Sequence, residues 1–222
     1  MRQDSLGHVR VAIDGPSGAG KSTVAKRVAN AISADYIDTG AMYRAIALKL
    51  IREGVEPASD GDDRLAALLA ATVVDFSGGR AMLDGVDVTA DIRSADVTLT
   101  ASRCSALPSV REKLVELQRA MGRAKSVVMD GRDIGTNVFP DAEYKFFLTA
   151  SAEERAKRRY AEITARGDKA DYGEVLRSIE KRDYDDSHRA LNPLARADDA
   201  VLVDTDGIGI EEVTEKILSY MV

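Results

Sequence analysis

The chain has one cysteine, Cys104, and no tryptophan. A single cysteine excludes an intramolecular disulfide, and in an apolar helical segment it is expected to be a small buried side chain rather than a catalytic thiol. No stretch approaches the roughly 20 apolar residues that a membrane span needs, and residues 1–8 lack the apolar run of a signal peptide. These absences predict a cytoplasmic protein that does not bind membranes.

The chain also lacks an excess of basic residues. Its 222 residues include 31 Lys and Arg against 37 Asp and Glu, a net charge of −6, with both signs mixed along the sequence. General nucleic-acid binders present a basic surface, so we expect no nucleic-acid partner, although a local basic cleft for phosphates remains compatible with this balance. The length favours one domain, 1–222, with at most a modest insertion.

Short apolar runs alternate with stretches of helical periodicity along most of the chain. This alternation predicts an α/β fold, with a parallel five-stranded sheet that helices cover on both faces. We expect strands at residues 9–13, 36–37, 127–129, 144–148 and 200–203. We expect helices at 22–32, 41–51, 65–71, 108–122, 151–167, 172–187 and 211–220. Gly54 and Gly167 are expected to end two of these helices, Pro108 to begin another, and the capping-box pattern of Ser151 and Glu154 to begin a third.

Residues 60–106 differ from their surroundings, and composition changes at residues 57–63. Two short apolar segments, 72–76 and 81–83, flank Ser77-Gly78-Gly79-Arg80, which is typical of a hairpin. We therefore expect an inserted subdomain at about 60–106.

The segment G-P-S-G-A-G-K-S at residues 15–22 matches the phosphate-loop pattern in full. It follows a predicted strand and opens a predicted helix, the context in which this motif binds nucleoside triphosphates. Glycines let several backbone N–H groups point at one anion, and the helix N-terminus adds positive potential. Lys21 is expected to reach the outer phosphates and the Ser22 hydroxyl to ligate Mg²⁺. The alternative is a glycine-rich turn without a ligand.

Three further clusters bear on what receives the phosphoryl group. They are D-T-G-A-M-Y-R at residues 38–44, D-G-R-D at 130–133, and a helix that carries Arg182, Asp186 and Arg189. Ligands of open parallel sheets lie beyond the carboxyl ends of the strands, so the first two should share an edge with the phosphate loop. Spacings of four and three allow one helix face to present the third cluster if the helix continues as far as Arg189. Taken separately, the clusters also fit a helix cap, a loop with its own ion pair and a solvated helix face.

These segments resemble bacterial cytidylate kinases. The resemblance rests on residues 13–23, 38–44, 130–136 and 138–141, and on Arg182-Asp183, Arg189-Ala190 and Pro193-Leu194. It covers nearly the whole chain in motif order, and D-G-R-D-I-G-T is highly specific to that family among nucleoside monophosphate kinases. It implies a P-loop NTPase fold with a core at about 8–59, 107–150 and 188–222, an acceptor-binding insertion and a mobile helical lid at about 151–170. The implied reaction is reversible, Mg²⁺-dependent transfer of the ATP γ-phosphoryl group to CMP or dCMP, and we expect a monomer.

The resemblance also implies roles for individual residues. ATP would be held by Gly15, Pro16, Ser17, Gly18, Ala19, Gly20, Lys21, Ser22, Thr23, Arg155 and Arg158. CMP would be held by Thr39, Tyr43, Arg44, Ser102, Arg111, Asp130, Arg132, Asp133, Arg182, Asp186 and Arg189. Lys21, Arg132, Arg159 and Arg189 would act in the transfer, and Ser22 would ligate the metal, with Asp130 or Asp14 binding it through water.

Base selection would follow from Asp133 and Arg111. A carboxylate accepts from the cytosine amino group and a guanidinium donates to the carbonyl, whereas uracil would set a carbonyl against the carboxylate. Ser102 would assist, although it also fits an ordinary helix residue. The chain departs from the family at Ser22 (glycine in some members), at Thr39 (commonly serine), and at Tyr184, Asp185 and Ser187, which replace a more basic run.

The expected lid carries Arg155, Arg158 and Arg159 within about one turn, so one helix face can present them. On closure, Arg155 or Arg159 would act as an arginine finger while water is excluded. The alternative is a solvated basic face.

Two other functions stay open at this point. One is a P-loop kinase for another acceptor, such as UMP, shikimate or a sugar. The other is a protein that uses ATP as a switch for partner binding, which would show no acceptor-dependent release of ADP.

Overall fold

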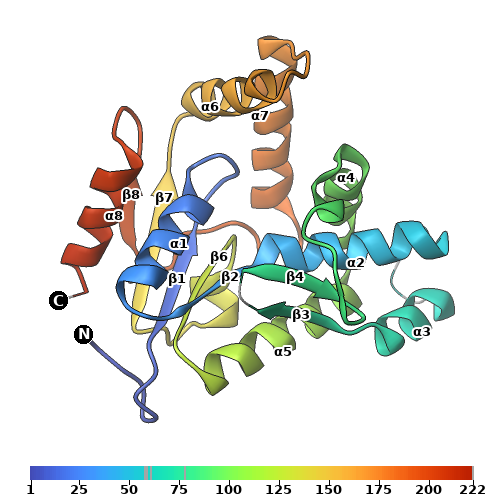
Figure 1. The fold of residues 1–222 in the computed structure, drawn as a ribbon, viewed down its shortest axis with the longest axis horizontal. Helices are drawn as coiled ribbons and strands as arrows, with labels where there is room; N and C mark the ends of the chain where they lie inside the picture. The colour runs from blue at the N-terminus through green and yellow to red at the C-terminus, as the bar shows by residue number, and fades with distance from the viewer. Residues whose placement is uncertain (58–59, 61, 78, 222) are drawn as a thin grey trace.

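A parallel sheet of five strands forms the centre of the molecule, in a computed structural model that describes residues 1–57, 60, 62–77 and 79–221 (Figure 1). The strand order is β2-β6-β1-β7-β8. The strands are β1 (Arg10–Asp14), β2 (Asp35–Asp38), β6 (Val127–Gly131), β7 (Tyr144–Thr149) and β8 (Val201–Asp204). All four pairings are parallel, which confirms the predicted α/β sheet. The carboxyl ends of the strands therefore meet at one edge, where the predicted clusters lie.

Helices cover both faces of this sheet. One face packs against α1 (Lys21–Ala31) and α8 (Ile210–Ser219), and the other against α2 (Thr39–Glu53) and α5 (Pro108–Ala124). Successive residues of β1 serve opposite faces, because strand side chains alternate. Val11 and Ile13 lie in the core cluster under α1 and α8, while Ala12 lies in the cluster under α2 and α5.

Local signals set the helix ends where the sequence predicts them. Gly54 follows α2 with φ 62, the left-handed conformation that glycine adopts without cost. Pro108 occupies the first turn of α5, where its missing N–H has no partner to lose. The Ser151 hydroxyl accepts a hydrogen bond from the backbone N–H of Glu154 at 3.2 Å. These predictions are confirmed.

The inserted segment folds as a small α/β unit beside α2. It contains α3 (Asp63–Ala71), β3 (Val74–Ser77), β4 (Arg80–Leu83), β5 (Val86–Asp87), a 3-10 turn η1 (Asp91–Arg93) and α4 (Ala95–Cys104). Strands β3 and β4 form the predicted antiparallel hairpin, and β5 adds a third strand that the sequence did not predict. The turn residue Gly78, and residues 58, 59 and 61 at the predicted start of the insertion, lie outside the described residues. Cys104 is buried, and burial raises the pKa of its thiol to about 12, as expected for a packing residue.

Two helices near the C-terminal part of the chain form a hairpin above the sheet edge. They are α6 (Ala152–Ala165) and α7 (Tyr172–His188) (Figure 1). The rings of Tyr160 and Tyr172 meet edge to face, with centres 6.1 Å apart. The predicted lid thus corresponds to α6, which packs along α7. In the described part of the chain, no helix is both long and apolar enough to cross a bilayer.

Candidate active site

The phosphate loop joins β1 to α1 and is shaped by its glycines. Gly15, Gly18 and Gly20 have φ angles of 144, 82 and 85, which favour glycine. A Cβ atom on Gly15 would lie 1.9 Å from the carbonyl oxygen of Leu148, so no other residue fits there. The result is a loop of backbone N–H groups at the N-terminus of α1, which suits an anion.

Lys21 lies at the start of α1, and its ammonium group is enclosed by protein. Its Nζ donates to the backbone oxygen of Pro16 at 2.7 Å, and the residue is 6% exposed. Burial, followed by the charge of Arg132, lowers the pKa of Lys21, while the carboxylates of Asp130 and Asp14 oppose this shift. A bound anion next to Lys21 would stabilise its charged form.

Ser22 and Asp130 meet where α1 approaches β6. The Ser22 hydroxyl donates to Asp130 Oδ2 and the Tyr36 hydroxyl to Oδ1, both at 2.8 Å. The Thr39 hydroxyl donates to the backbone oxygen of Asp130 at 2.7 Å. Burial, then the charge of Asp38, raises the pKa of Asp130, so a cation placed here would be stabilising.

This pair fits a phosphate-bound Mg²⁺ ion. Among the residues that the structure describes, no group of three or more His, Cys, Asp and Glu side chains could hold a metal by itself. Mg²⁺ at phosphate-transfer sites commonly takes only one or two protein oxygens, with phosphates and water completing its shell. A hydroxyl and a buried carboxylate in direct contact supply that minimal set.

Asp14, the last residue of β1, connects the phosphate loop to the D-G-R-D segment. Its carboxylate accepts from the backbone N–H groups of Ile134 and Gly135 at 2.8 and 2.7 Å. These residues begin η2 (Ile134–Val138), a short π-helical turn after β6. Burial raises the pKa of Asp14 to about 6 against the opposing effect of these two hydrogen bonds. Asp14 therefore fixes the turn that carries Asp133 and supports Arg132.

Three arginines, Arg44, Arg132 and Arg182, form a cluster near Lys21 of the phosphate loop. Arg132 Nε donates to Asp186 Oδ2 at 2.8 Å, and Arg44 Nη2 pairs with Asp38 Oδ2 at 3.0 Å. Arg182 belongs to the same group, because burial and then the charge of Arg132 lower its pKa, with Arg44 adding to the effect. Its Nε is buried without a hydrogen-bond partner in the described part of the chain. These arginines form a second centre of positive potential beside Lys21.

Asp186 is the carboxylate that holds this group together from α7. Burial raises its pKa, but the charge and hydrogen bond of Arg132 outweigh burial and leave the pKa below its ordinary value. Asp186 is 8% exposed, which differs from the solvated helix face that the residue spacing alone allows. The carboxylate therefore stays ionised and fixes Arg132 in place.

Asp133 organises a second set of contacts, next to the first. One of its oxygens accepts from Arg111 Nη2 and, at 3.1 Å, from Asn137 Nδ2, and the other accepts from Arg189 Nη2 at 3.2 Å. The Arg111 guanidinium also lies 5.9 Å from the centre of the Tyr43 ring. A carboxylate has about four acceptor positions, so these three contacts leave room for one more donor.

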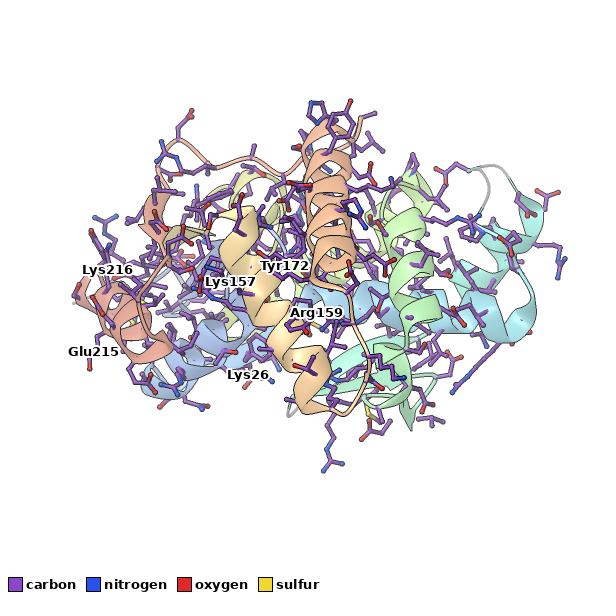
Figure 2. All side chains as sticks on the ribbon, turned by 90° about the horizontal axis from the view of Figure 1, so that it is seen from above. Lys26, Lys157, Arg159, Tyr172, Glu215 and Lys216 are labelled. Carbon is purple, nitrogen blue, oxygen red and sulfur yellow. The ribbon has the colours of Figure 1, made fainter. Side chains whose placement is uncertain are left out.

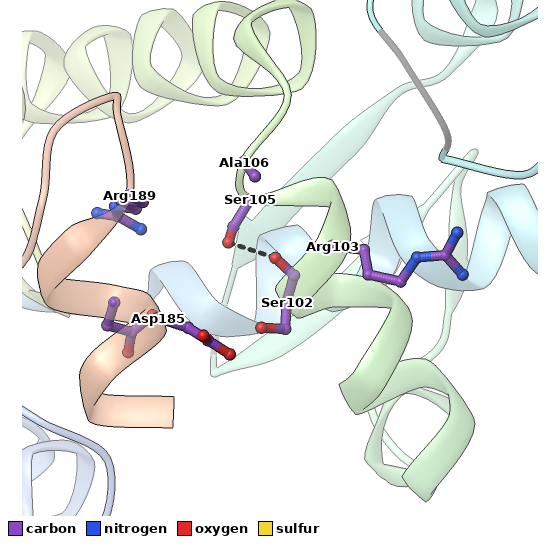
Figure 3. A pocket seen from close by; sticks show the side chains of 7 residues that line it. Ser102, Arg103, Ser105, Ala106, Asp185 and Arg189 are labelled. Atoms are coloured by element: carbon purple, nitrogen blue, oxygen red, sulfur yellow. Dashed lines mark hydrogen bonds between the residues drawn. The ribbon is translucent and has the colours of Figure 1, made fainter. Parts of the chain in front are cut away.

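A cavity of about 230 Å³ opens between the end of α4 and α7 (Figure 3). Ser102 and Ser105 lie on the α4 side, with the Ser105 hydroxyl bonded to the backbone oxygen of Ser102 at 2.8 Å. Asp185 and Arg189 line the α7 side together with Asp186. Predicted acceptor residues from segments far apart in the sequence thus share one cavity.

The three lid arginines have different partners. Arg155 pairs with Asp183 and donates to the backbone oxygen of Ser17 in the phosphate loop at 3.1 Å, and it is 4% exposed. Arg158 donates to the hydroxyl and backbone oxygens of Thr205 at 3.1 and 2.6 Å. Arg159, labelled in Figure 2, is exposed and pairs with Glu162 of its own helix. Their spacing on α6 still places the three on one side of that helix, although each has a different partner.

The predicted clusters come together with two changes. Asp38 caps α2 by accepting from the N–H of Ala41, which confirms the helix-cap interpretation, and it also pairs with Arg44. Arg132 and Asp133 of D-G-R-D form ion pairs with Asp186 of α7 and Arg111 of α5 and not with each other, so the interpretation of a loop held by its own ion pair is wrong. Arg189 does not lie on the face of α7, because the helix ends at His188 and Arg189 follows in an extended conformation, with φ −64 and ψ 143.

Several residues of the site were not predicted from the sequence. Tyr36, Asn137 and Asp183 form hydrogen bonds to predicted site residues, and Ser105 and Asp185 line the cavity. Asp183 and Asp185 are adjacent to predicted site residues, and Asn137 directly follows the D-G-R-D-I-G-T motif. Their proximity in the sequence could therefore have identified them as site residues. Tyr36 had no signal, because its contact depends on which strand neighbours β2.

Comparison with known proteins gives one family. A family model described as "Cytidylate kinase" matches residues 11–222. The chain is 49% identical to a cytidylate kinase of Caldanaerobacter subterraneus subsp. tengcongensis, with 94% of this chain and 92% of the relative covered. It is 52% identical to a cytidylate kinase of Chloroherpeton thalassium, with 91% and 88% covered.

Among solved structures, the likeness extends to the fold alone. A shikimate kinase from Bacteroides thetaiotaomicron has a TM-score of 0.50 at 13% identity, covering 96% of this chain and 98% of its own. An uncharacterized protein from Eubacterium ventriosum has a TM-score of 0.52 at 12% identity, with the same coverage. The likeness to the shikimate kinase agrees with the P-loop kinase fold predicted from the sequence.

Proposed function

The chain belongs to the cytidylate kinase family, and on that premise we propose that it catalyses reversible transfer of the γ-phosphoryl group of ATP to CMP and dCMP. The main structural support for this function is that the buried Lys21 of the phosphate loop lies near Arg132 and Arg182. Burial and the charges of these two arginines lower the pKa of Lys21. Two adjoining anion sites are what a phosphotransferase with a phosphate acceptor needs, whereas an ATP switch needs only one.

On the donor side, the phosphate-loop N–H groups and Lys21 hold the ATP phosphates. Ser22 and Asp130 would hold Mg²⁺, which would neutralise part of the phosphate charge when bound. Arg155 contacts the loop through the backbone oxygen of Ser17, and Arg158 contacts Thr205, whose hydroxyl also lies 3.5 Å from the backbone oxygen of Ala19. We assign these two arginines to the nucleoside and phosphate ends of ATP.

On the acceptor side, Arg44 and Arg132 hold the CMP phosphate, with Arg182 at the junction between phosphate and sugar. Asp186 and Arg189 contact the sugar side of the cavity described above. The remaining acceptor position of Asp133 takes the cytosine amino group, and Arg111 donates to the cytosine carbonyl. Ser102 and Tyr43 complete the walls of the base site.

The transfer itself depends on alignment and charge. The CMP phosphate is largely ionised at neutral pH, so it attacks without a strong general base. Arg132 has contacts to the acceptor side and an electrostatic interaction with Lys21, so we place it at the transferring group. Arg159 reaches that group only if α6 moves, and Arg189 steadies the acceptor through Asp133.

We further propose that the enzyme acts as a cytoplasmic monomer, with residues 60–106 as the acceptor-binding insertion and α6 as the lid. The cytoplasmic assignment rests on the lone cysteine and the mixed charge of the sequence. Size-exclusion chromatography with light scattering measures the oligomeric state directly, and a mass of twice 23.9 kDa contradicts the monomer.

The deciding experiment is a coupled assay of ADP release with CMP, dCMP, UMP and AMP compared under identical conditions. We expect rapid release with CMP and dCMP and a much lower kcat/KM with UMP and AMP. Preference for UMP or AMP contradicts the assigned base site. Slow hydrolysis of ATP that no acceptor accelerates supports the ATP switch and rejects the kinase.

A further inference from the structure

Tyr36 lies next to the proposed metal site but belongs to none of its motifs. It is in β2, where it pairs with Val128 of β6, and Asp38 pairs with Asp130 two residues further on. Residues two apart on a strand share a face, so Tyr36 and Asp130 are diagonal neighbours on adjacent strands. The long tyrosine side chain spans that diagonal, and its hydroxyl donates to Asp130 Oδ1 at 2.8 Å.

The two oxygens of Asp130 have different hydroxyl donors. Oδ1 accepts from Tyr36 and Oδ2 from Ser22, each at 2.8 Å. A carboxylate held at both oxygens resists rotation about its Cβ–Cγ bond. A serine hydroxyl that donates its hydrogen to a carboxylate keeps its lone pairs for another partner. Tyr36 therefore acts on the orientation of Ser22 through Asp130.

The tyrosine ring is fixed by contacts that do not involve its hydroxyl. The ring meets Phe76 of β3 edge to face, with ring centres 6.1 Å apart and an interplanar angle of 86°. Lys26 belongs to α1, and its ammonium group lies 5.4 Å from the centre of the Tyr36 ring. The ring also packs against both core clusters. Removing the hydroxyl alone should leave the ring in place, so its contribution can be measured separately from packing.

We propose that Tyr36 is a positioning residue for the metal-dependent part of ATP binding. Its hydroxyl fixes the Asp130 carboxylate, which holds Ser22 in the orientation that Mg²⁺ requires. The proposal rests on the proposed function, because it takes Ser22 and Asp130 as the metal-facing pair. It also gives the inserted sheet a supporting role at the donor site, through the contact of Phe76 with the Tyr36 ring.

The test is the Tyr36→Phe variant, examined by isothermal titration calorimetry. ATP affinity is measured in excess Mg²⁺ and again in EDTA, and the ratio of the two dissociation constants reports the metal's contribution. We expect Tyr36→Phe to reduce that ratio roughly tenfold, as for the loss of one hydrogen bond to a charged group, with affinity in EDTA within about twofold. The matched control is Tyr220→Phe, whose exposed ring meets Phe146 edge to face at 6.2 Å outside the site. It should leave both constants unchanged.

A double-mutant cycle with Ser22→Ala separates positioning from general support. If Tyr36 acts through Asp130 and Ser22, the Tyr36→Phe change should have little further effect on the ratio once Ser22 is absent. Full additivity of the two changes overturns the proposal. So does an equal loss of affinity with Mg²⁺ and with EDTA, or an unchanged ratio in a variant whose circular dichroism and melting temperature match the wild type. Acceptor-dependent ADP release by the wild type tests the kinase assignment separately, so either proposal can fail alone.

Discussion

The two sides of the proposed active site, the donor side for ATP and the acceptor side for CMP, are built in different ways. On the donor side, one continuous segment of eight residues, 15–22, supplies backbone N–H groups and one buried lysine. On the acceptor side, side chains from β2, α2, α5, the turn after β6, and α7 form a network of guanidinium and carboxylate groups. The partners in that network are far apart in the chain, since Arg132 and Asp186 are separated by 54 residues.

This difference predicts different sensitivities. A site made of backbone fails when the backbone cannot adopt its conformation, and most side chains in it can change. A site made of paired charges keeps its fold but loses function when one partner is removed, because the other charge is left without compensation. The predictions below test this contrast, beginning with the two largest expected effects.

The Gly15→Ala substitution should disable the donor side. The new Cβ would lie 1.9 Å from the backbone oxygen of Leu148 at a φ of 144, so β1, β7 or the loop must shift. We expect ATP affinity to fall by at least about 100-fold and stability by about 3 kcal/mol, because strain and a steric clash combine. Calorimetry and thermal melting measure the two effects.

Gly54→Ala is the matched control for Gly15→Ala. Gly54 also has a positive φ, 62, but nothing lies within 4 Å of its Cβ position. Only the left-handed conformation is then penalised, at about 1 kcal/mol, and ATP affinity should be unchanged. Equal losses in the two variants would show that conformational strain, not the approach of Leu148, limits the loop.

The Arg132→Ala substitution should separate turnover from ATP binding. Arg132 pairs with Asp186 and interacts with Lys21, so its loss removes charge at the transferring group and leaves a buried carboxylate unpaired. We expect kcat to fall roughly 1,000-fold, in the range of other arginines at transferring phosphates, with ATP affinity changed only a few-fold. Steady-state kinetics and calorimetry give both numbers.

Arg52→Ala serves as the control for Arg132→Ala, because Arg52 pairs with Asp91 at 2.7 Å on the exposed side of α2. Its kinetics should match the wild type, since exposed ion pairs contribute little. Near-normal turnover of Arg132→Ala would remove this residue from the proposed mechanism.

The donor side and the sheet could be predicted from the sequence because their signals are local. The phosphate loop is contiguous, the strands are short apolar runs, and Gly54, Pro108 and Ser151 mark helix ends by their own conformational preferences. The predicted helix limits differ from the observed ones by a few residues, which is the usual uncertainty at helix ends.

The acceptor side could be predicted only as a set of residues, and not as a network. Nothing local to Asp133 indicates that it contacts Arg111, Asn137 and Arg189, since these contacts depend on how α5 and α7 pack over the sheet. For the same reason the place of Arg189 could not be predicted, because it depended on how far the helix continued, and α7 ends at His188. Likewise, the contact of Tyr36 with Asp130 requires the strand order, which alternation of strands and helices does not specify.

The Asp133→Asn substitution should weaken recognition of the base with little effect on the fold. An amide keeps the size of the carboxylate, but it loses the charge that pairs with Arg111 and Arg189 and presents N–H to one of these two donors, which needs an acceptor. We expect kcat/KM for CMP to fall about 30-fold, with a smaller loss for UMP, because a mispaired polar group costs a few kcal/mol. Kinetics with the two nucleotides measure the change in preference.

Asp141→Asn is the control for Asp133→Asn, because Asp141 pairs with Arg10 at 3.1 Å and its side chain is 73% exposed. Removing that charge should leave both kcat/KM values unchanged. An Asp133→Asn enzyme that still prefers CMP to UMP as strongly as the wild type would exclude Asp133 as the base-reading residue.

The smallest expected effect is a proton taken up when ATP binds. Burial and Arg132 lower the pKa of Lys21 in the nucleotide-free protein, so part of the population is neutral at alkaline pH. Phosphate groups beside Lys21 favour the charged form and restore the proton. At pH 8 to 9, calorimetry in buffers of different ionisation enthalpy should detect uptake of less than one proton per ATP bound. Lys21→Arg, which stays charged, should abolish the uptake.

The lowered pKa of Lys21 also predicts how stability depends on pH, an effect that bound ATP should reduce. Between the lowered pKa of Lys21 and its ordinary value of 10.5, the unfolded chain binds more protons at this residue than the folded chain does. The contribution of Lys21 to the free energy of unfolding therefore rises with pH through that window in the nucleotide-free protein. Bound ATP should flatten this rise by returning the pKa toward its ordinary value. Chemical denaturation at pH 7 and pH 9, with wild type and Lys21→Arg compared, isolates the contribution. A rise of equal size in both proteins would assign the pH dependence to other groups. The anion pocket would then lack the lowered lysine pKa that distinguishes it from the acceptor side, where the buried carboxylates of Asp133 and Asp186 already have cationic partners.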